Sequence, residues 1–384
     1  EIVIMRNDID EFILLKDLVA FKSVTPEHAG SLDYIAKIIE QLGGVVTRVD
    51  RNQTANLIAE IGTGDKIFAF AGHVDVVPTG DVALWTGGDP FNLFEDDELL
   101  IGRGVADMKG AIAAFIVALA QFIQTNDVSK YKIMLLLTAD EEGCAIDGTP
   151  VIVEYLKLHN IQINNCIIGE PSCTDTLGDV IKVGRRGSLT GNLIISGKQG
   201  HIAYPHLCEN PIHLFAPALL ELTQICWDNG NKYFPPTSLQ FANLNSGLGV
   251  TNVIPGSLTT NFNFRYNTEH THESLQQQVV NILTKHNLSY ELTWSHSAKP
   301  FMAPVGKLVS DLHSAISRVC GISSISKTDG GTSDGRFLIE CCDEMLEFGL
   351  RNNNIHQVNE SIAKQDLTKL TQIYNQLLRL VFSR

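Results

Sequence analysis

Five residues of the kinds that bind zinc follow one another along this chain in an order that suits a two-metal site. They are two histidines and three carboxylates: His73, Asp107, Glu142, Glu170 and His356. Imidazole nitrogen and carboxylate oxygen are both ligands of Zn²⁺, and catalytic zinc sites leave a position open for water. Two neighbouring ions need a shared carboxylate, and we expect Asp107 to bridge them. His73 and Glu170 would complete one ion, and Glu142 and His356 the other.

Two further carboxylates are placed to assist these ligands. Glu141 directly precedes Glu142, and adjacent residues of an extended segment point in opposite directions. We therefore assign metal binding to Glu142 and proton transfer to Glu141, which would take a proton from metal-bound water and give it to a leaving amine. Asp75 lies two residues after His73 on the same side of a strand, so its carboxylate is expected to accept the imidazole N–H.

The elements that must position these residues alternate between buried strands and helices. Each apolar run has the length and aliphatic content of a strand buried on both faces, and it leads directly into one of the acids or histidines. This alternation predicts an α/β domain with a mostly parallel sheet, whose ligands lie at the carboxyl ends of the strands. The predicted strands are 67–71, 132–138 and 166–168, and the predicted helices are 31–42, 109–123 and 148–158.

The pattern changes after about residue 187. Apolar and polar residues then alternate as in strands with one exposed face, which indicates a smaller α+β unit. Its predicted strands are 189–195, 238–243 and 257–266, and its predicted helices are 211–227 and 273–286. We therefore predict a discontinuous catalytic domain, residues 1–186 and 300–384, with an inserted α+β domain at 187–299.

The composition excludes several classes of function. With 29 basic against 43 acidic residues the formal net charge is −14, which argues against a nucleic-acid partner. Eight cysteines without a CxxC pair indicate free thiols and a reducing cytoplasm. The first residues do not resemble a signal peptide, and the apolar stretch at 111–123 is too short to span a bilayer. We expect a soluble cytoplasmic protein with no membrane partner.

Motifs around these residues resemble those of the co-catalytic zinc aminoacylase and carboxypeptidase family, over nearly the whole chain. Motifs of the broad family are SVTP at 23–26, GHVDVVP at 72–78, GRGVADMKG at 102–110 and DEEG at 140–143. More specific stretches indicate the branch that removes succinyl groups: HIAYPH at 201–206, TNVIPG at 251–256 and GGTSDGR at 330–336. Other matching segments are 169–172, 184–187, 263–266 and 355–360.

The resemblance implies two Zn²⁺ per subunit, which Co²⁺ can replace, and a homodimer formed through the inserted domain. It implies a small-molecule substrate, N-succinyl-LL-2,6-diaminopimelate, hydrolysed to succinate and LL-2,6-diaminopimelate on the bacterial route to lysine. It also implies that His201 reaches the active site from the partner subunit and donates a hydrogen bond to the tetrahedral oxyanion. Expected substrate-binding residues are Arg185 (with Arg186), Tyr204, Asn252, Arg265, Gly331 and Thr332.

Two segments depart from the family pattern, and other functions remain open. The departures are the loop 80–89 and the segment 349–356, where Arg351 is unusual. A related enzyme such as an acetylornithine deacetylase or a metallo-exopeptidase would share the metals and Glu141 but differ in its substrate pocket. A non-catalytic scaffold predicts loss of a ligand or of the base, and none is lost. A secreted carboxypeptidase conflicts with the free thiols and the missing signal sequence.

Overall fold

The chain divides into two compact units. The computed structural model describes residues 9–304 and 306–383. The first unit comprises Glu1–Gly184, Ala303–Lys327 and Ser333–Arg384, and the second comprises Arg185–Met302 and Thr328–Thr332. Assignment of 328–332 to the catalytic domain was therefore wrong. This segment joins the second unit because the Thr328 hydroxyl donates to the Tyr233 carbonyl at 2.5 Å and Arg185 donates to the carbonyls of Asp329 and Gly331.

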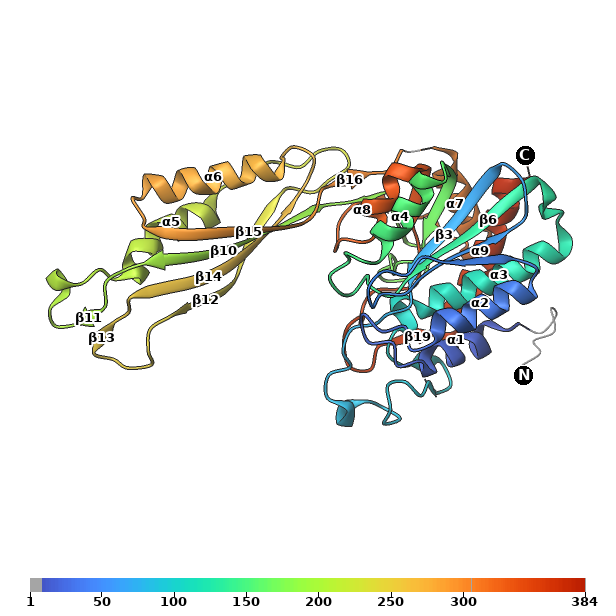
Figure 1. Ribbon diagram of the computed structural model, residues 1–384, viewed down its shortest axis with the longest axis horizontal. Coiled ribbons are helices and arrows are strands. Elements are labelled where there is room, and N and C mark those ends of the chain that lie inside the picture. The colour runs from blue at the N-terminus through green and yellow to red at the C-terminus, as the bar shows by residue number, and fades with distance from the viewer. Residues whose placement is uncertain (1–8, 305, 384) are drawn as a thin grey trace. The chain divides into compact units, whose positions relative to one another are not determined.

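An eight-stranded sheet forms the centre of the first unit (Figure 1). β3 pairs in parallel with β6 and β7, and β18 continues the parallel arrangement beyond β7. The prediction of an α/β domain with a mainly parallel central sheet is confirmed. In spatial order the strands are β1 (Val45–Arg48), β2 (Asn56–Ile61), β6 (Tyr131–Thr138), β3 (Lys66–His73), β7 (Ile163–Ile168), β18 (Cys342–Glu347), β8 (Val180–Lys182) and β17 (Ile325–Lys327).

Helices enclose this sheet, and the most apolar of them is a core helix. The segment Val105–Thr125 is long and apolar enough to cross a membrane, but it is almost entirely buried inside the first unit. Phe115 stacks on Phe70 of β3 with ring centroids 4.4 Å apart and meets Tyr374 at 5.8 Å. The helices are α1 (Glu11–Ala20), α2 (Ser31–Gln41), α3 (Gly110–Thr125), α4 (Thr149–Leu158), α7 (Lys307–Cys320), α8 (Gly335–Leu338) and α9 (Lys364–Phe382).

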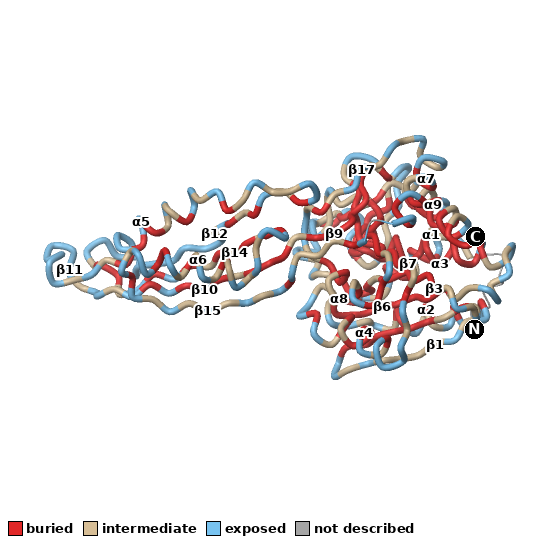
Figure 2. The backbone as a smooth tube through the Cα atoms, turned by 90° about the horizontal axis from the view of Figure 1, so that it is seen from above, coloured by how far each residue is buried: buried red, intermediate tan, exposed pale blue. Residues whose placement is uncertain are grey.

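Short elements connect these helices and strands. β4 (Phe94–Glu95), β5 (Leu99–Ile101) and β19 (Ser361–Ala363) form a small sheet, and β9 (Gly184–Arg185) pairs with β16 (Phe301–Met302). An irregular turn, η2 (Val105–Lys109), leads into α3. The 3₁₀ turns are η1 (Val82–Leu84), η3 (Val128–Lys130), η4 (Pro205–Leu207) and η5 (Ile339–Cys341). Figure 2 shows that burial is densest in the first unit around β3, β6 and β7.

The second unit is a four-stranded antiparallel sheet with two helices on one face (Figure 1). Inward side chains of the sheet, among them Leu193 and Phe262, pack with Phe215 of α5 and Val279 of α6. The edge strand β15 was not predicted, because every second residue in it is only partly buried and the apolar signal is weak. The elements are β12 (Ser238–Ser246), β14 (Ser257–Tyr266), β10 (Gly187–Ser196), β15 (Tyr290–Ala298), α5 (Pro211–Gln224), α6 (His272–Lys285), and the separate pair β11 (Gly200–His201) and β13 (Val253–Ile254).

Candidate dinuclear metal centre

Three neighbouring strands end at the predicted metal ligands. His73 is the last residue of β3, Glu142 follows the end of β6, and Glu170 follows the end of β7. Because β3 lies between β6 and β7 and is parallel to both, these three side chains emerge at the same edge of the sheet. Asp107 comes from the turn before α3, and His356 from the loop between β18 and β19. The structure thus brings all five predicted ligands together within the first unit.

Asp107 stands at the centre of this group. Its Oδ1 lies 3.2 Å from Nε2 of His73, and its Oδ2 lies 3.1 Å from Nε2 of His356. His356 Nε2 also lies 2.9 Å from Glu142 Oε1, and His73 Nε2 lies 3.8 Å from Glu170 Oε1. The two carboxylate oxygens therefore face two different imidazoles, which is the arrangement that a bridging carboxylate requires.

Glu141 belongs to the same cluster. Its Oε2 lies 4.0 Å from His73 Nε2, and one ligand atom each of His73, Glu141 and Glu170 lie within 4.8 Å of one another. A second such group consists of His73, Asp107 and Glu142. A set of imidazoles and carboxylates at these separations fits two divalent cations of the zinc type.

Asp75 acts differently from the prediction. The imidazole Nδ1 of His73 lies 2.9 Å from the backbone carbonyl of Asp75 and 3.6 Å from its carboxylate. The carboxylate instead accepts the backbone N–H groups of Glu141 at 3.3 Å and Glu142 at 3.1 Å. The tautomer of His73 is therefore set by a main-chain carbonyl. The Asp75 side chain holds the turn that carries the base and a ligand.

The electrostatics of the cluster match a site made for cations. Burial and the nearby Glu170 carboxylate raise the pKa of Glu141 well above its ordinary value. Burial also works against ionised Asp107, but hydrogen bonds from His356 and His73 outweigh it and hold the pKa of Asp107 below its usual range. Hydrogen bonds to Asp107 and Glu142 raise the pKa of His356 to about 10. A protonated His356 thus offsets part of the negative charge in the metal-free protein, and a bound metal would displace that proton.

The predicted substrate-binding residues lie in the second unit in two groups. Arg185 is buried, and its Nη1 donates to the Gly331 carbonyl at 3.3 Å, with Thr332 next in the chain. Arg265 is half-buried, and burial together with the nearby Arg186 lowers its pKa. The guanidinium groups of Arg186 and Arg265 therefore form a local positive patch in an acidic protein, as an anionic ligand would need.

The other group surrounds the β11–β13 pair. The N–H of Ile202 donates to the Asn252 carbonyl at 3.1 Å, and the N–H of Tyr204 donates to the His201 carbonyl at 2.9 Å. The rings of His201 and Tyr204 lie 5.6 Å apart, and both residues are exposed. His201, Tyr204 and Asn252 therefore form one exposed group.

Contacts hold in place both segments that depart from the family pattern. Arg351 Nε lies 2.8 Å from the Asp366 carboxylate at the start of α9, so Arg351 ties its loop to that helix. Trp85 anchors the loop 80–89, since it is buried and its indole N–H donates to the Thr79 carbonyl at 2.9 Å. No role was predicted for Glu360, although it ends the matching segment 355–360. Its carboxylate binds the backbone around Asp107.

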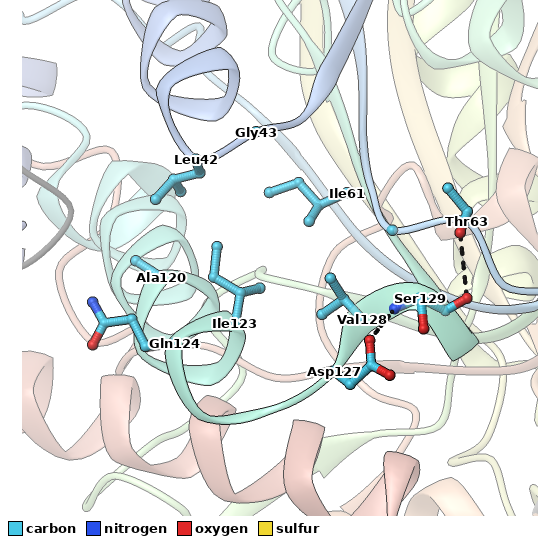
Figure 3. A pocket seen from close by; sticks show the side chains of 11 residues that line it. Leu42, Gly43, Ile61, Thr63, Ala120, Ile123, Gln124, Asp127, Val128 and Ser129 are labelled. Carbon is cyan, nitrogen blue, oxygen red and sulfur yellow. Dashed lines mark hydrogen bonds between the residues drawn. The ribbon is translucent and has the colours of Figure 1, made fainter.

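A separate pocket of about 490 Å³ lies at the end of α3, and Figure 3 shows its lining. Leu42, Ile61 and Ile123 supply apolar walls, and Asp127 accepts the backbone N–H of Ser129 at 3.0 Å. None of the predicted ligands or substrate-binding residues lines it. Thr63 and Asp127 both bond to Ser129, and no histidine, cysteine or second carboxylate is among the described residues that line the pocket, so it offers no chemistry comparable to that of the metal centre.

Comparison with known proteins gave relatives along nearly the whole chain. The model of peptidase family M20/M25/M40 matches residues 69–380. A succinyl-diaminopimelate desuccinylase of Nitrosospira multiformis is 48% identical over 365 residues, covering 95% of this chain and 96% of that protein. A succinyl-diaminopimelate desuccinylase of Methylobacillus flagellatus is 47% identical over 361 residues, covering 94% and 96%.

Solved structures show the same fold at low sequence identity. The M20 family metallo-carboxypeptidase Sso-CP2 from Sulfolobus solfataricus matches with a TM-score of 0.80 and 17% identity, covering 97% of this chain and 99% of that one. The YXEP protein of Bacillus subtilis, a dinuclear metal-binding peptidase of the M20 family, matches with a TM-score of 0.72 and 15% identity, covering 97% and 98%.

Proposed function

The chain belongs to peptidase family M20/M25/M40 and is an amide-bond hydrolase, and we propose that it hydrolyses N-succinyl-LL-2,6-diaminopimelate with two Zn²⁺ per subunit. One observation carries the metal part of the proposal: Asp107 presents one oxygen to His73 and the other to His356. The substrate is proposed because two relatives of nearly half-identical sequence carry that activity in their names. Co²⁺ is expected to substitute for zinc, since it takes the same ligands.

Glu141 moves the proton in the proposed reaction. Bound zinc would polarise the amide carbonyl and lower the pKa of the attacking water. Glu141 takes a proton from that water while the water oxygen bonds to the amide carbon. The C–N bond then breaks, and Glu141 delivers the proton to the departing amine, which leaves succinate and LL-2,6-diaminopimelate. A pKa raised by burial and by Glu170 suits a group that must both accept and return a proton.

The second unit supplies recognition in this proposal. Arg185 and Arg265 would bind substrate carboxylates, for which a planar guanidinium is the best protein partner. Tyr204, Asn252, Gly331 and Thr332 would complete the contacts. His201 would donate a hydrogen bond to the oxygen of the tetrahedral intermediate, from the other subunit of a homodimer.

Features of the second unit support a homodimer formed through it. β12 is an edge strand, and exposed edge strands readily pair with another chain. The apolar side chains of Leu244 in β12 and of Leu248 and Val250 in the loop after it are exposed, as are those of Ile212 and Leu220 on α5. All eight cysteines are free, which supports the proposed cytoplasmic location.

The proposed substrate is tested by assaying the protein with two substrates side by side. Purified protein is stripped of metal, reloaded with Zn²⁺ and assayed with N-succinyl-LL-2,6-diaminopimelate and N-acetylornithine. We expect kcat/KM to be at least about 10²-fold higher for the succinyl substrate than for N-acetylornithine. A site that binds the additional charged groups of the succinyl substrate rejects a ligand that lacks those groups. Preference for the acetyl substrate would assign the protein to the deacetylases, and activity on neither would reject the proposal.

A further inference from the structure

A carboxylate that is not a metal ligand lies buried behind the metal centre. Glu360 is 1% exposed. Its Oε1 accepts the backbone N–H groups of Ala106 at 2.9 Å and Asp107 at 3.0 Å. Its Oε2 accepts the N–H of Gly104 at 3.0 Å and Nη1 of Arg103 at 2.9 Å. A carboxylate has about four lone pairs for hydrogen bonding, so Glu360 is fully used and has no capacity left to bind metal.

Arg103 also donates hydrogen bonds to the two segments that follow His73 and His356. It is also 1% exposed. Its Nη2 donates to the Pro78 carbonyl at 3.2 Å, in the segment that leaves β3 after His73. Its Nη1 donates to the Gln357 carbonyl at 3.1 Å, and Gln357 directly follows His356. One guanidinium therefore joins the backbones that follow His73 and His356, and Glu360 joins it to the backbone of Asp107.

The loop 80–89 reinforces the same contacts. The Arg103 guanidinium lies over the Trp85 ring at 5.1 Å from its centroid, a cation–π contact. The backbone N–H of Thr86 donates to Asn359 Oδ1 at 2.7 Å. This loop therefore contacts Arg103 through Trp85 and the turn after His356 through Thr86.

The turn that carries His356 needs such support. His356 and Asn359 both have left-handed backbone conformations, with φ of 64° and 61°. This region is unfavourable for residues other than glycine and persists where surrounding contacts enforce it. Here the hydrogen bonds from Arg103 to Gln357 and from Thr86 to Asn359 bracket the turn.

We infer that Glu360, acting through Arg103, is a positioning residue of the metal centre that holds the backbones bearing Asp107, His73 and His356 in ligating geometry. This inference rests on the proposed function insofar as the site binds metal. In this role Glu360 binds no metal itself but holds the backbone of residues that do. Groups behind metal ligands usually affect metal affinity by about 10–100-fold.

The rival explanation is that the Arg103–Glu360 pair merely stabilises the fold. Buried ion pairs are often replaceable without loss of stability, so a change in folding alone would not distinguish the two roles. The informative readout is metal affinity, measured on metal-free protein by competition with a chromophoric chelator. The visible spectrum of Co²⁺-loaded protein reports ligand geometry independently of turnover.

The test compares Glu360→Gln with a matched carboxylate-to-amide change. Four N–H groups donate to the Glu360 carboxylate. In Glu360→Gln one carboxylate oxygen becomes an NH₂ group, which faces two of these N–H groups and cannot accept their hydrogen bonds. We expect weaker Zn²⁺ binding by about 10–100-fold and an altered Co²⁺ spectrum. Glu221→Gln is the control, because it makes the same carboxylate-to-amide change at an ion pair with Lys285 in the second unit, which holds none of the predicted ligands. Its metal affinity should equal that of the wild type.

A second variant keeps the inference testable if Glu360→Gln does not fold. Arg103→Lys keeps the positive charge beside Glu360 but lacks the planar fork that reaches Pro78 and Gln357 together. It should weaken metal binding in the same direction by a smaller factor. Wild-type affinity in both variants, or an equal loss in Glu221→Gln, overturns the inference while leaving the proposed function intact. A wild-type protein that binds no divalent metal overturns both.

Discussion

The two units present their predicted functional residues in opposite ways. In the first unit His73, Asp107 and Glu170 are buried, Asp107 contacts two histidines within 3.2 Å, and of the five ligands His356 alone is exposed. In the second unit His201 and Tyr204 lie on a short two-stranded element, and Tyr204 is 55% exposed. The first unit therefore builds its site from its own side chains. The exposed group of the second unit can act only on a ligand or surface brought to it.

The largest expected effect tests the first unit. Glu141→Gln removes the proton-transfer group but not a metal ligand, so turnover should fall by about 10²–10⁴-fold. Metal content, measured by elemental analysis, should stay at the wild-type value. Near-normal turnover would remove Glu141 from its role, and loss of metal would show that it is a ligand, as its place beside His73 and Glu170 also allows.

The next effect tests the second unit. His201→Ala should reduce kcat by about 10²–10³-fold, because one hydrogen bond to the oxyanion is lost. Metal content should not change, since the predicted ligands all lie in the first unit. The exposed His206, in the same loop, offers a matched control as His206→Ala, which should keep wild-type kcat.

Mixing the two inactive variants sharpens the comparison further. If His201 acts across a homodimer, a mixed dimer of Glu141→Gln and His201→Ala chains contains one intact site. After subunit exchange an equal mixture should regain about a quarter of wild-type activity, as random pairing predicts. No recovery, in a mixture shown to exchange subunits, would place His201 in the same chain as the site it serves.

The smallest effect concerns pH and the metal-free first unit. The pKa of His356 is raised to about 10, above its unfolded value of 6.5, by hydrogen bonds to Asp107 and Glu142. The protonated imidazole therefore stabilises the fold fully below pH 6.5, and this contribution is lost as the pH rises through 10.

His356→Asn should accordingly lower the Tm of metal-free protein by about 1–3 °C at pH 6.5, a small effect because His356 is partly exposed and screened by solvent. The difference in Tm between variant and wild type should shrink toward pH 10.5. Thermal unfolding followed by circular dichroism measures it. A difference that stays constant or grows with pH would contradict the assigned charge state.

The ligands were predictable because each carries two local signals. His73, Glu142 and Glu170 combine a metal-binding side chain with a position just after a buried aliphatic strand, and parallel strands bring such positions to one edge. The α/β fold followed from the same runs.

Features that depend on side-chain direction or on distant contacts were not predictable. Spacing placed Asp75 beside His73, but the rotamer sends its carboxylate to the backbone of Glu141 and Glu142. Glu360 contacts a turn more than 250 positions earlier in the chain, a separation that no local pattern reports. β15 was missed because an edge strand has little buried surface and so carries a weak apolar period.

The position of β18 has a consequence for biosynthesis. β18 lies between β7 and β8 in the sheet, yet the main part of the second unit separates it from both in the chain. A ribosome therefore releases His73, Glu142 and Glu170 long before the strand that fills this gap and before His356. Until then β7 and β8 each present an unpaired edge, and such edges associate readily with other chains. The cell can load metal fully only into a polypeptide whose translation is nearly finished.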